Sequence, residues 1–134
     1  MARKEGSTMP ALGDLEEIVL EHLWEVGESD VIATHAAVGR RRGITVNTVG
    51  SSLERLHRKG LVIRRKVSHA YRYETALNRD TFRARRLVQA AGSPRQLASH
   101  GLLAAFVDLV SDADAAALEQ LERLIARKRA QGSS

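Results

Sequence analysis

Residues 45–77 decide the fold: TVNTVGSSLERLHRKGLVIRRKVSHAYRYETAL. Apolar residues recur in the first half at helical spacing, at Val46, Val49, Leu53 and Leu56. Thr45 stands before them as a residue suited to cap a helix N-terminus. Arg58 and Lys59 suit the negative end of the helix dipole, and Gly60 is typical of a helix stop. This half is therefore predicted to be a helix from Thr45 to Gly60.

The second half of the stretch has the composition of a β-hairpin. Segments 61–67 and 71–77 are rich in β-branched, aromatic and basic residues, and a tight turn separates them. Because side chains alternate along a strand, we expect Arg64 and Lys66 on one face and Arg65 on the other.

Two more helices are predicted before Thr45. The first has apolar residues at helical spacing and ends at Gly27: Leu12, Leu15, Ile18, Val19, Leu23 and Val26. Ser29 or Asp30 can cap the second, which includes Val31, Ile32 and Val38 and ends near Gly39. The stretch RRRG then forms a short basic connection. Three helices followed by a basic hairpin have the order of a winged helix-turn-helix.

The rest of the chain is predicted to form three helices. The first spans residues 80–91, and the second begins after the capping box Ser93-Pro94-Arg95-Gln96. The last begins at residues 111–114. These helices are too few to enclose a core, so we expect them to pair with a second copy. The residues assigned to that interface are Leu87, Leu102, Leu103, Phe106, Leu109, Leu118, Leu121, Leu124 and Ile125. Alternatively, the helices fold back on the N-terminal domain of a monomer.

The predicted fold class is therefore mostly α with a small β-hairpin (α+β), a winged helix-turn-helix followed by a helical dimerisation region. We place a flexible arm at 1–11, the winged-helix domain at 12–78, the dimerisation region at 79–130 and a disordered tail at 131–134.

Charge is segregated along the 134 residues, whose formal net charge is only +5. Residues 12–39 contain seven acids and no Lys or Arg, whereas residues 40–74 contain ten bases and two acids. A basic block of this kind indicates a polyanion site. The alternative is that the two blocks are solvated faces that pair with each other.

Several classes of site are excluded. The chain has no Cys, which excludes disulfides, Cys-bound metals and thiol nucleophiles. No apolar run approaches the roughly 18 residues of a membrane span, and no apolar stretch follows the basic start, so we expect a cytoplasmic protein without membrane insertion. The five His residues form no zinc-binding helix pair, and no nucleophile elbow is present. We expect no catalytic residues, metal or cofactor.

The exposed face of the third helix carries side chains that suit the major groove. Asn47 can pair with adenine, Thr48 and Ser51 can reach bases or phosphates, and Arg55 can reach guanine or phosphate. Gly50 lies between them and either lets the backbone approach DNA closely or is merely tolerated.

Three stretches, LGDLEEIVLEHLWEVGE (12–28), TVNTVGSSLERLHRKGLV (45–62) and AYRYETAL (70–77), resemble the BlaI/MecI/CopY family of bacterial winged-helix repressors, the penicillinase repressors. The segment LLAAFVDLVSDADAAALEQLERLIARK (102–128) is similar to the dimerisation segment of that family.

The resemblance implies a homodimer that binds an inverted repeat in double-stranded operator DNA and represses transcription. The expected DNA-binding residues are Arg42, Thr45, Asn47, Thr48, Ser51, Arg55, Arg65, Lys66 and His69. In the penicillinase branch, a membrane-bound sensor protease releases the DNA by cutting between Asn and Phe, where this chain has Ala105 and Phe106. The copper-responsive branch uses a Cys cluster, which this chain lacks.

Three alternatives remain open: an enzyme, a ligand-responsive winged-helix regulator of another family, and a sequence-nonspecific nucleoid protein. Failure to bind any DNA would favour the enzyme. Stabilisation by a small molecule that also weakens operator binding would favour the ligand-responsive regulator, and a footprint independent of sequence would favour the nucleoid protein.

Overall fold

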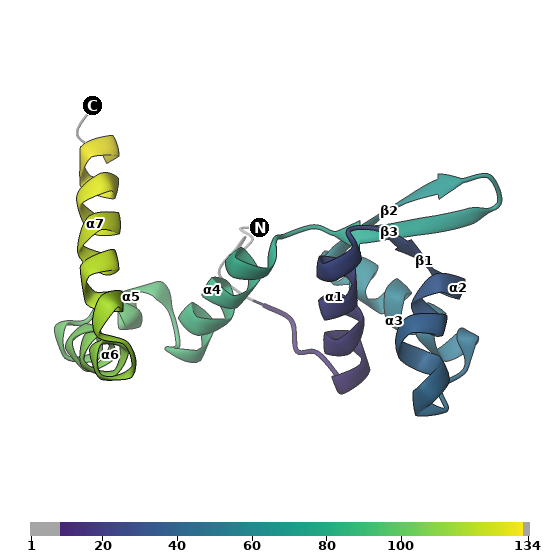
Figure 1. Ribbon diagram of the computed structural model, residues 1–134, viewed down its shortest axis with the longest axis horizontal. Helices are drawn as coiled ribbons and strands as arrows, with labels where there is room; N and C mark the ends of the chain where they lie inside the picture. Colours follow the sequence, from purple (N-terminus) through teal and green to yellow (C-terminus); the bar gives the residue numbers. More distant parts are fainter. Residues whose placement is uncertain (1–8, 133–134) are drawn as a thin grey trace, which may run out of the picture. The chain divides into compact units, whose positions relative to one another are not determined.

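The computed structural model describes residues 9–132, which form two compact units, one ending at Leu87 and one starting at Val88. The first unit contains α1 (Asp14–Val26), β1 (Ser29–Asp30), α2 (Val31–Thr34), η1 (His35–Gly39), η2 (Arg40–Arg42), α3 (Val46–Arg58), β2 (Val62–Val67), β3 (Ala70–Thr75) and most of α4 (Arg79–Ala90). The second contains α5 (Pro94–Leu97), α6 (His100–Ala113) and α7 (Ala115–Gly132). Figure 1 labels these elements. The predicted α+β class, with a winged helix and a helical region, is confirmed.

The core of the first unit lies between α1, α3 and the sheet. Its buried apolar residues are Met9, Val19, Leu20, Leu23, Val38, Val49, Leu53, Leu56, Leu61, Val62, Tyr73 and Phe82. Met9 belongs to this core, although the predicted flexible arm spans residues 1–11. Residues 1–8 of that arm lie outside the described residues. Val26 and Ile32 occupy predicted helical apolar positions but are exposed, and Val26 is the last residue of α1.

The sheet has three antiparallel strands in the order β1-β3-β2. The hairpin of β2 and β3 extends beyond the helices in Figure 1. Strand β1 has no signal in the sequence, because two residues show no strand periodicity. Its Asp30 pairs with Arg72 of β3, which brings the end of α1 beside the hairpin.

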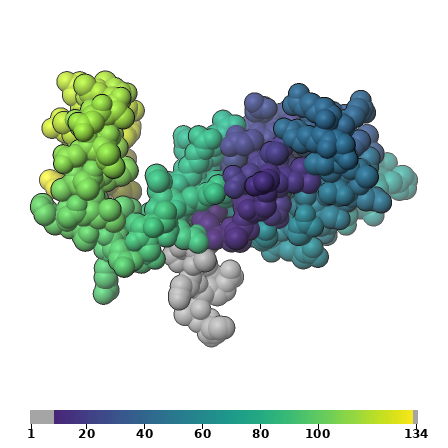
Figure 2. All heavy atoms as spheres, turned by 90° about the horizontal axis from the view of Figure 1, so that it is seen from below, coloured from purple at the N-terminus to yellow at the C-terminus, as the bar shows by residue number. Residues whose placement is uncertain are grey.

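The second helix is less regular than predicted. The α-helical turn α2 passes into a π-helical turn, η1, and the expected basic connection is the 3-10 turn η2. In the space-filling view, α1 (purple) lies beside the blue segment that contains this turn (Figure 2). Gly39 packs so closely that a Cβ there would lie 2.8 Å from His35 and 3.0 Å from Val49. His35 in turn donates a hydrogen bond from Nε2 to the Ile44 carbonyl (2.7 Å), which holds the start of α3.

Helix α4 packs against α1, so it belongs mainly to the first unit rather than to a separate region starting at residue 79. The Trp24 indole donates a hydrogen bond to the Leu77 carbonyl (2.8 Å), and its ring lies 5.3 Å from that of buried Phe82. Three ion pairs join the exposed parts of the helices: Arg79–Glu21 (2.9 Å), Arg83–Glu21 (3.2 Å) and Arg86–Glu17 (3.4 Å).

The second unit starts and ends its helices differently from the prediction. Ser93 caps α5, but this helix ends at Leu97, and Ser99 caps α6 as a new helix. Residues 111–113 end α6 instead of opening α7. Helix α7 continues through Gly132, so residues 131 and 132 of the expected tail are helical, and residues 133–134 lie outside the described residues.

Candidate nucleic-acid interface

Helix α3 has one buried face and one polar, largely exposed face. Val49, Leu53 and Leu56 are completely buried against the core. Residues three and four apart lie on the same side of a helix, so the side chains opposite the buried face also lie together. With Val31 and Val46, the residues on that side line an open groove: Asn47, Gly50, Ser51, Glu54, Arg55 and Arg58. A helix of this kind fits a major groove about 12 Å wide.

The N-terminal turn of α3 presents three of the predicted DNA-binding side chains. Thr45 accepts a hydrogen bond from the Thr48 amide at its Oγ1 (3.2 Å), as its predicted capping role requires. The hydroxyl oxygens of Thr45 and Thr48 lie 3.0 Å apart and satisfy each other. Asn47 is exposed and its side chain makes no hydrogen bond within the described part of the chain, so its side-chain amide is available to a ligand.

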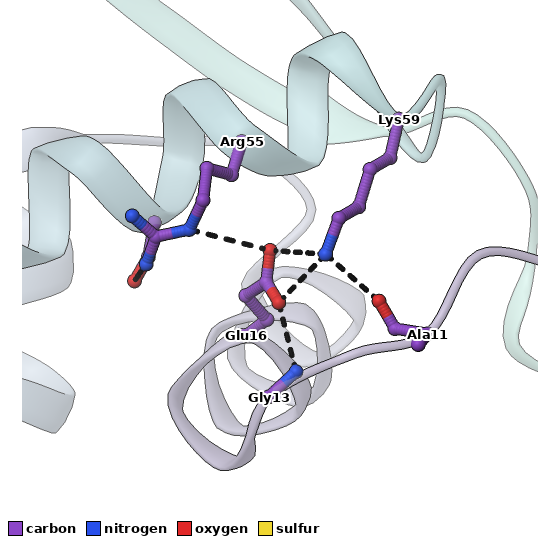
Figure 3. Close-up of polar contacts among 6 residues, drawn as sticks. Ala11, Gly13, Glu16, Arg55 and Lys59 are labelled. Carbon is purple, nitrogen blue, oxygen red and sulfur yellow. Dashed lines mark hydrogen bonds and ion pairs between the residues drawn. The ribbon is translucent and has the colours of Figure 1, made fainter.

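Arg55 is directed toward α1 rather than straight out from the helix. Its Nε lies 3.7 Å from Oε2 of Glu16, and its Nη2 donates a hydrogen bond to Ser52 (3.2 Å). Figure 3 shows Arg55 and Lys59 of α3 converging on Glu16, while the side chain of Arg55 remains 46% exposed. Glu16 therefore sets the direction of Arg55 beside the groove.

The carboxylate of Glu16 has a fixed set of donors. The Gly13 amide donates to Oε1 (2.8 Å), and Lys59 donates to both oxygens and to the Ala11 carbonyl (Figure 3). Burial raises the pKa of Glu16, but the Gly13 amide and Lys59 lower it by more, so the pKa lies below its ordinary value. The carboxylate therefore stays charged and pins the C-terminal end of α3 to α1.

A second carboxylate joins α3 to the hairpin. Glu54 accepts hydrogen bonds from Arg64 and from the Tyr73 hydroxyl (3.0 Å). Burial raises the pKa of Glu54, but the bonds from Tyr73 and Arg64 lower it by more. The guanidinium of Arg64 also lies 4.2 Å from the centre of the Tyr71 ring, which favours a cation–π contact. Arg64 is thus part of the scaffold and holds the hairpin at a set angle to α3.

The strand register confirms the predicted alternation of the hairpin. Arg64 pairs with buried Tyr73 and Lys66 pairs with Tyr71, whereas Arg65 pairs with Arg72 on the other face. The side chains of Lys66 and His69 are exposed near the tip and form no ion pair or hydrogen bond within the described residues. Arg65 is held by Glu28, with nitrogen–oxygen distances of 2.9 and 3.0 Å.

Several cations lie near α3 that sequence analysis did not include in the site. Arg58 shares the groove with Asn47 and Ser51, and helical spacing alone could have identified it. Arg40 and Arg41 are exposed in η2, next to predicted Arg42. Arg42 donates a hydrogen bond to the Val38 carbonyl (2.7 Å) and remains exposed. Arg55 and Arg58 therefore place positive charge in the groove along α3, whereas Arg41 and Arg42 line a different groove with Glu17, Glu21 and Glu25 of α1.

The two charge blocks pair only in part. Glu16 and Glu28 of the acidic block bind basic-block residues, whereas Glu17 and Glu21 bind arginines of α4. Arg40, Arg41, Arg58 and Lys66 form no ion pair within residues 9–132. These cations are the part of the basic block that is left to attract a polyanion.

The second unit has no buried residue among those described. Eight of the nine residues assigned to a dimer interface are exposed, and Leu121 is half-buried. None of the described helices is both long and apolar enough to cross a membrane. Within the described residues, no group of three His, Asp or Glu side chains could hold a metal ion.

The chain is similar to a known protein family, to curated relatives and to a solved structure. A sequence model of the penicillinase repressor family matches residues 12–127. The transcriptional regulator BlaI of Mycobacterium tuberculosis, from strains H37Rv and CDC 1551, is 34% identical over 111 residues, which cover 81% of this chain and 80% of the relative. A crystal structure of a possible transcriptional regulatory protein from Mycobacterium bovis (fragment 1–100) is 28% identical, with a TM-score of 0.45, over 60% of this chain and 80% of that one.

Proposed function

Because this chain belongs to the penicillinase repressor family, we propose that it represses transcription as a cytoplasmic homodimer that binds an inverted-repeat operator in double-stranded DNA. The observation that carries this proposal is the face of α3, where the free amide of Asn47 and the hydroxyl of Ser51 lie in one open groove with Arg58. Such side chains can read base edges in the major groove, while surrounding cations contact phosphates.

The roles of the side chains follow from what holds each one. Asn47 and Ser51 are unrestrained and suit base contacts, whereas Arg55 is oriented by Glu16 toward the edge of the groove. Arg42 and Lys66 lie in η2 and on the hairpin, so they suit phosphates on either side of the groove. Thr45, Thr48, Arg65 and His69 complete the proposed surface.

Two copies of the chain would bury the apolar residues of the second unit. Leu109 is 70% exposed and Ile125 is 52% exposed, although residues of this kind are normally buried. Large apolar side chains left exposed together on two helices favour a protein interface. A two-fold symmetric dimer would then place two α3 helices on successive major grooves, which is why we expect an inverted repeat.

Release of DNA by proteolysis is a further part of the proposal. The bond between Ala105 and Phe106 lies inside α6, so a cut there would separate the first unit from α7 and from most of the apolar residues. Loss of those residues would undo the dimer and leave two weakly bound monomers. The proposed agent is a membrane-bound sensor protease, and incubation of the repressor with a purified candidate followed by mass spectrometry identifies the cut.

In vitro selection of random duplexes by the purified full chain tests the function. We expect selected sequences to contain a dyad whose half-sites are about one helical turn apart or a multiple of it. Enrichment of no sequence, with binding to all duplexes, would identify a nonspecific nucleoid protein. Absence of any binding would refute the proposed DNA-binding function.

A further inference from the structure

Glu28 occupies a position that joins three elements of the first unit. It follows Gly27, where α1 ends, and directly precedes β1. The pairing of β1 with β3 brings it beside Arg72, and the pairing of β3 with β2 places Arg65 directly across from Arg72. The carboxylate of Glu28 thus lies between two arginines that would otherwise repel each other.

The geometry is that of an arginine bound to an oxyanion. Arg65 donates from Nε to Oε2 (2.9 Å) and from Nη2 to Oε1 (3.0 Å), and Arg72 donates from Nε to Oε1 (3.0 Å). The planar fork of a guanidinium binds two oxygens of a carboxylate or of a phosphate in the same manner. Glu28 therefore fills a site that a DNA phosphate could also fill.

Exposure makes exchange between the two anions easy. The side chain of Arg65 is 64% exposed and that of Glu28 is 25% exposed, so water and ions reach the pair. Pairs as exposed as this contribute little to stability, whereas a phosphate contact also releases counterions from the DNA. The Arg72 and Arg65 hydrogen bonds lower the pKa of Glu28, so its carboxylate is charged at neutral pH.

We propose that Glu28 is a built-in competitor of DNA phosphate, which occupies Arg65 and Arg72 in the free protein and is displaced when DNA binds. The inference rests on the proposed function, because it requires that the hairpin contact DNA. Glu28 acts through Arg65 and Arg72, so it is a positioning residue that lowers affinity for every DNA sequence equally. It leaves the choice of sequence to α3.

The main test compares Glu28→Gln with the wild type on the selected operator and on a random duplex, across a range of salt concentrations. Binding to both duplexes should strengthen by the same factor, about two- to fivefold. The slope of log affinity against log salt should steepen by about one unit. Glu74→Gln is the matched control, because it removes the same charge from the face of β3 that also carries Arg72. Glu74 forms no ion pair among the described residues. If Glu28→Gln increases DNA affinity no more than Glu74→Gln does, the proposal is overturned.

Two further measurements keep the test independent of protein stability. In a background that carries both Arg65→Gln and Arg72→Gln, the gain from Glu28→Gln should fall to that of Glu74→Gln, and an unchanged gain would refute action through these two arginines. In the wild-type protein, the carboxyl carbon resonance of Glu28 should shift during titration with duplex DNA, and a resonance that does not move would also overturn the proposal. A wild-type protein that binds no duplex would instead refute the proposed function.

Discussion

The Nζ of Lys59 lies 2.9 Å from both carboxylate oxygens of Glu16. This contact joins the first turn of α1 to the end of α3 across 43 residues of sequence. Because the same carboxylate also orients Arg55, the placement of the proposed DNA-reading helix depends on one acidic side chain in α1.

Glu16→Gln should lower the free energy of unfolding by about 1–3 kcal/mol, because Lys59 and Arg55 lose the negative charge of a buried acceptor. Urea unfolding followed by circular dichroism measures the change. Glu25→Gln is the control, since Glu25 is exposed on the same helix and has no ion pair in the described part of the chain, so it should change stability by less than about 0.5 kcal/mol. Equal effects of the two changes would show that Glu16 does not hold the helices together.

The contribution of Glu16 should depend on pH in one direction. Its pKa in the folded protein lies below the ordinary value of 4.5, so folding favours the charged carboxylate. The contribution is therefore fully present above the unfolded pKa and is lost as the pH falls through the folded pKa. The stability advantage of the wild type over Glu16→Gln should be constant between about pH 7 and about pH 5 and should shrink below that range. An advantage that grows in acid would contradict the assignment.

Gly39 and Gly50 should respond to alanine in opposite ways. A Cβ at Gly39 would lie 2.8 Å from His35 and 3.0 Å from Val49, so Gly39→Ala should destabilise the protein by about 1–3 kcal/mol. A Cβ at Gly50 would lie 3.6 Å from Val31, an ordinary contact, so Gly50→Ala should stabilise α3 by about 0.5–1 kcal/mol. Thermal unfolding of both variants tests this.

Gly50→Ala also decides between the two interpretations of this glycine. Operator affinity that falls in the stabilised variant would show that the DNA backbone or a base approaches α3 closely at Gly50. Unchanged affinity would show that glycine is merely tolerated there.

Replacement of Asn47 should change the sequence preference of DNA binding, whereas replacement of Arg58 should change the affinity for all DNA. Asn47→Ala should reduce the preference for operator over random DNA by about 1–3 kcal/mol, because a base contact is lost. Arg58→Ala should weaken binding to both duplexes and lower the salt slope by about one unit, because a phosphate contact is lost. Fluorescence anisotropy with both duplexes separates the two outcomes. A loss of preference in Arg58→Ala would make Arg58 a base-reading residue instead.

The elements that sequence analysis predicted well are those with a local signal. Helix α3 has its cap, its apolar spacing and its terminal Gly60 within a short stretch, and the alternation along 62–67 follows from strand geometry alone. The orientation of Arg55 could not be predicted, because Glu16 is far away in sequence and no periodic pattern links the two. For the same reason the hydrogen bonds from Arg65 to the Glu28 carboxylate could not be predicted, since they depend on the two-residue strand β1.

Single charges placed on the second unit should prevent dimerisation. Leu109 in α6 and Ile125 in α7 are exposed in the isolated chain, and burial of one such side chain in a dimer contributes about 1.5–3 kcal/mol. Leu109→Glu and Ile125→Glu should therefore raise the dimer dissociation constant at least about tenfold, as sedimentation equilibrium would show. Ala130→Glu is the matched control, because it adds the same charge at an exposed position of α7 that is not three or four residues from any proposed interface residue, and it should leave the dimer intact. If both Leu109→Glu and Ile125→Glu remain dimeric, the interface lies on another part of the chain. If a monomeric variant still binds a single half-site of DNA, the first unit functions alone.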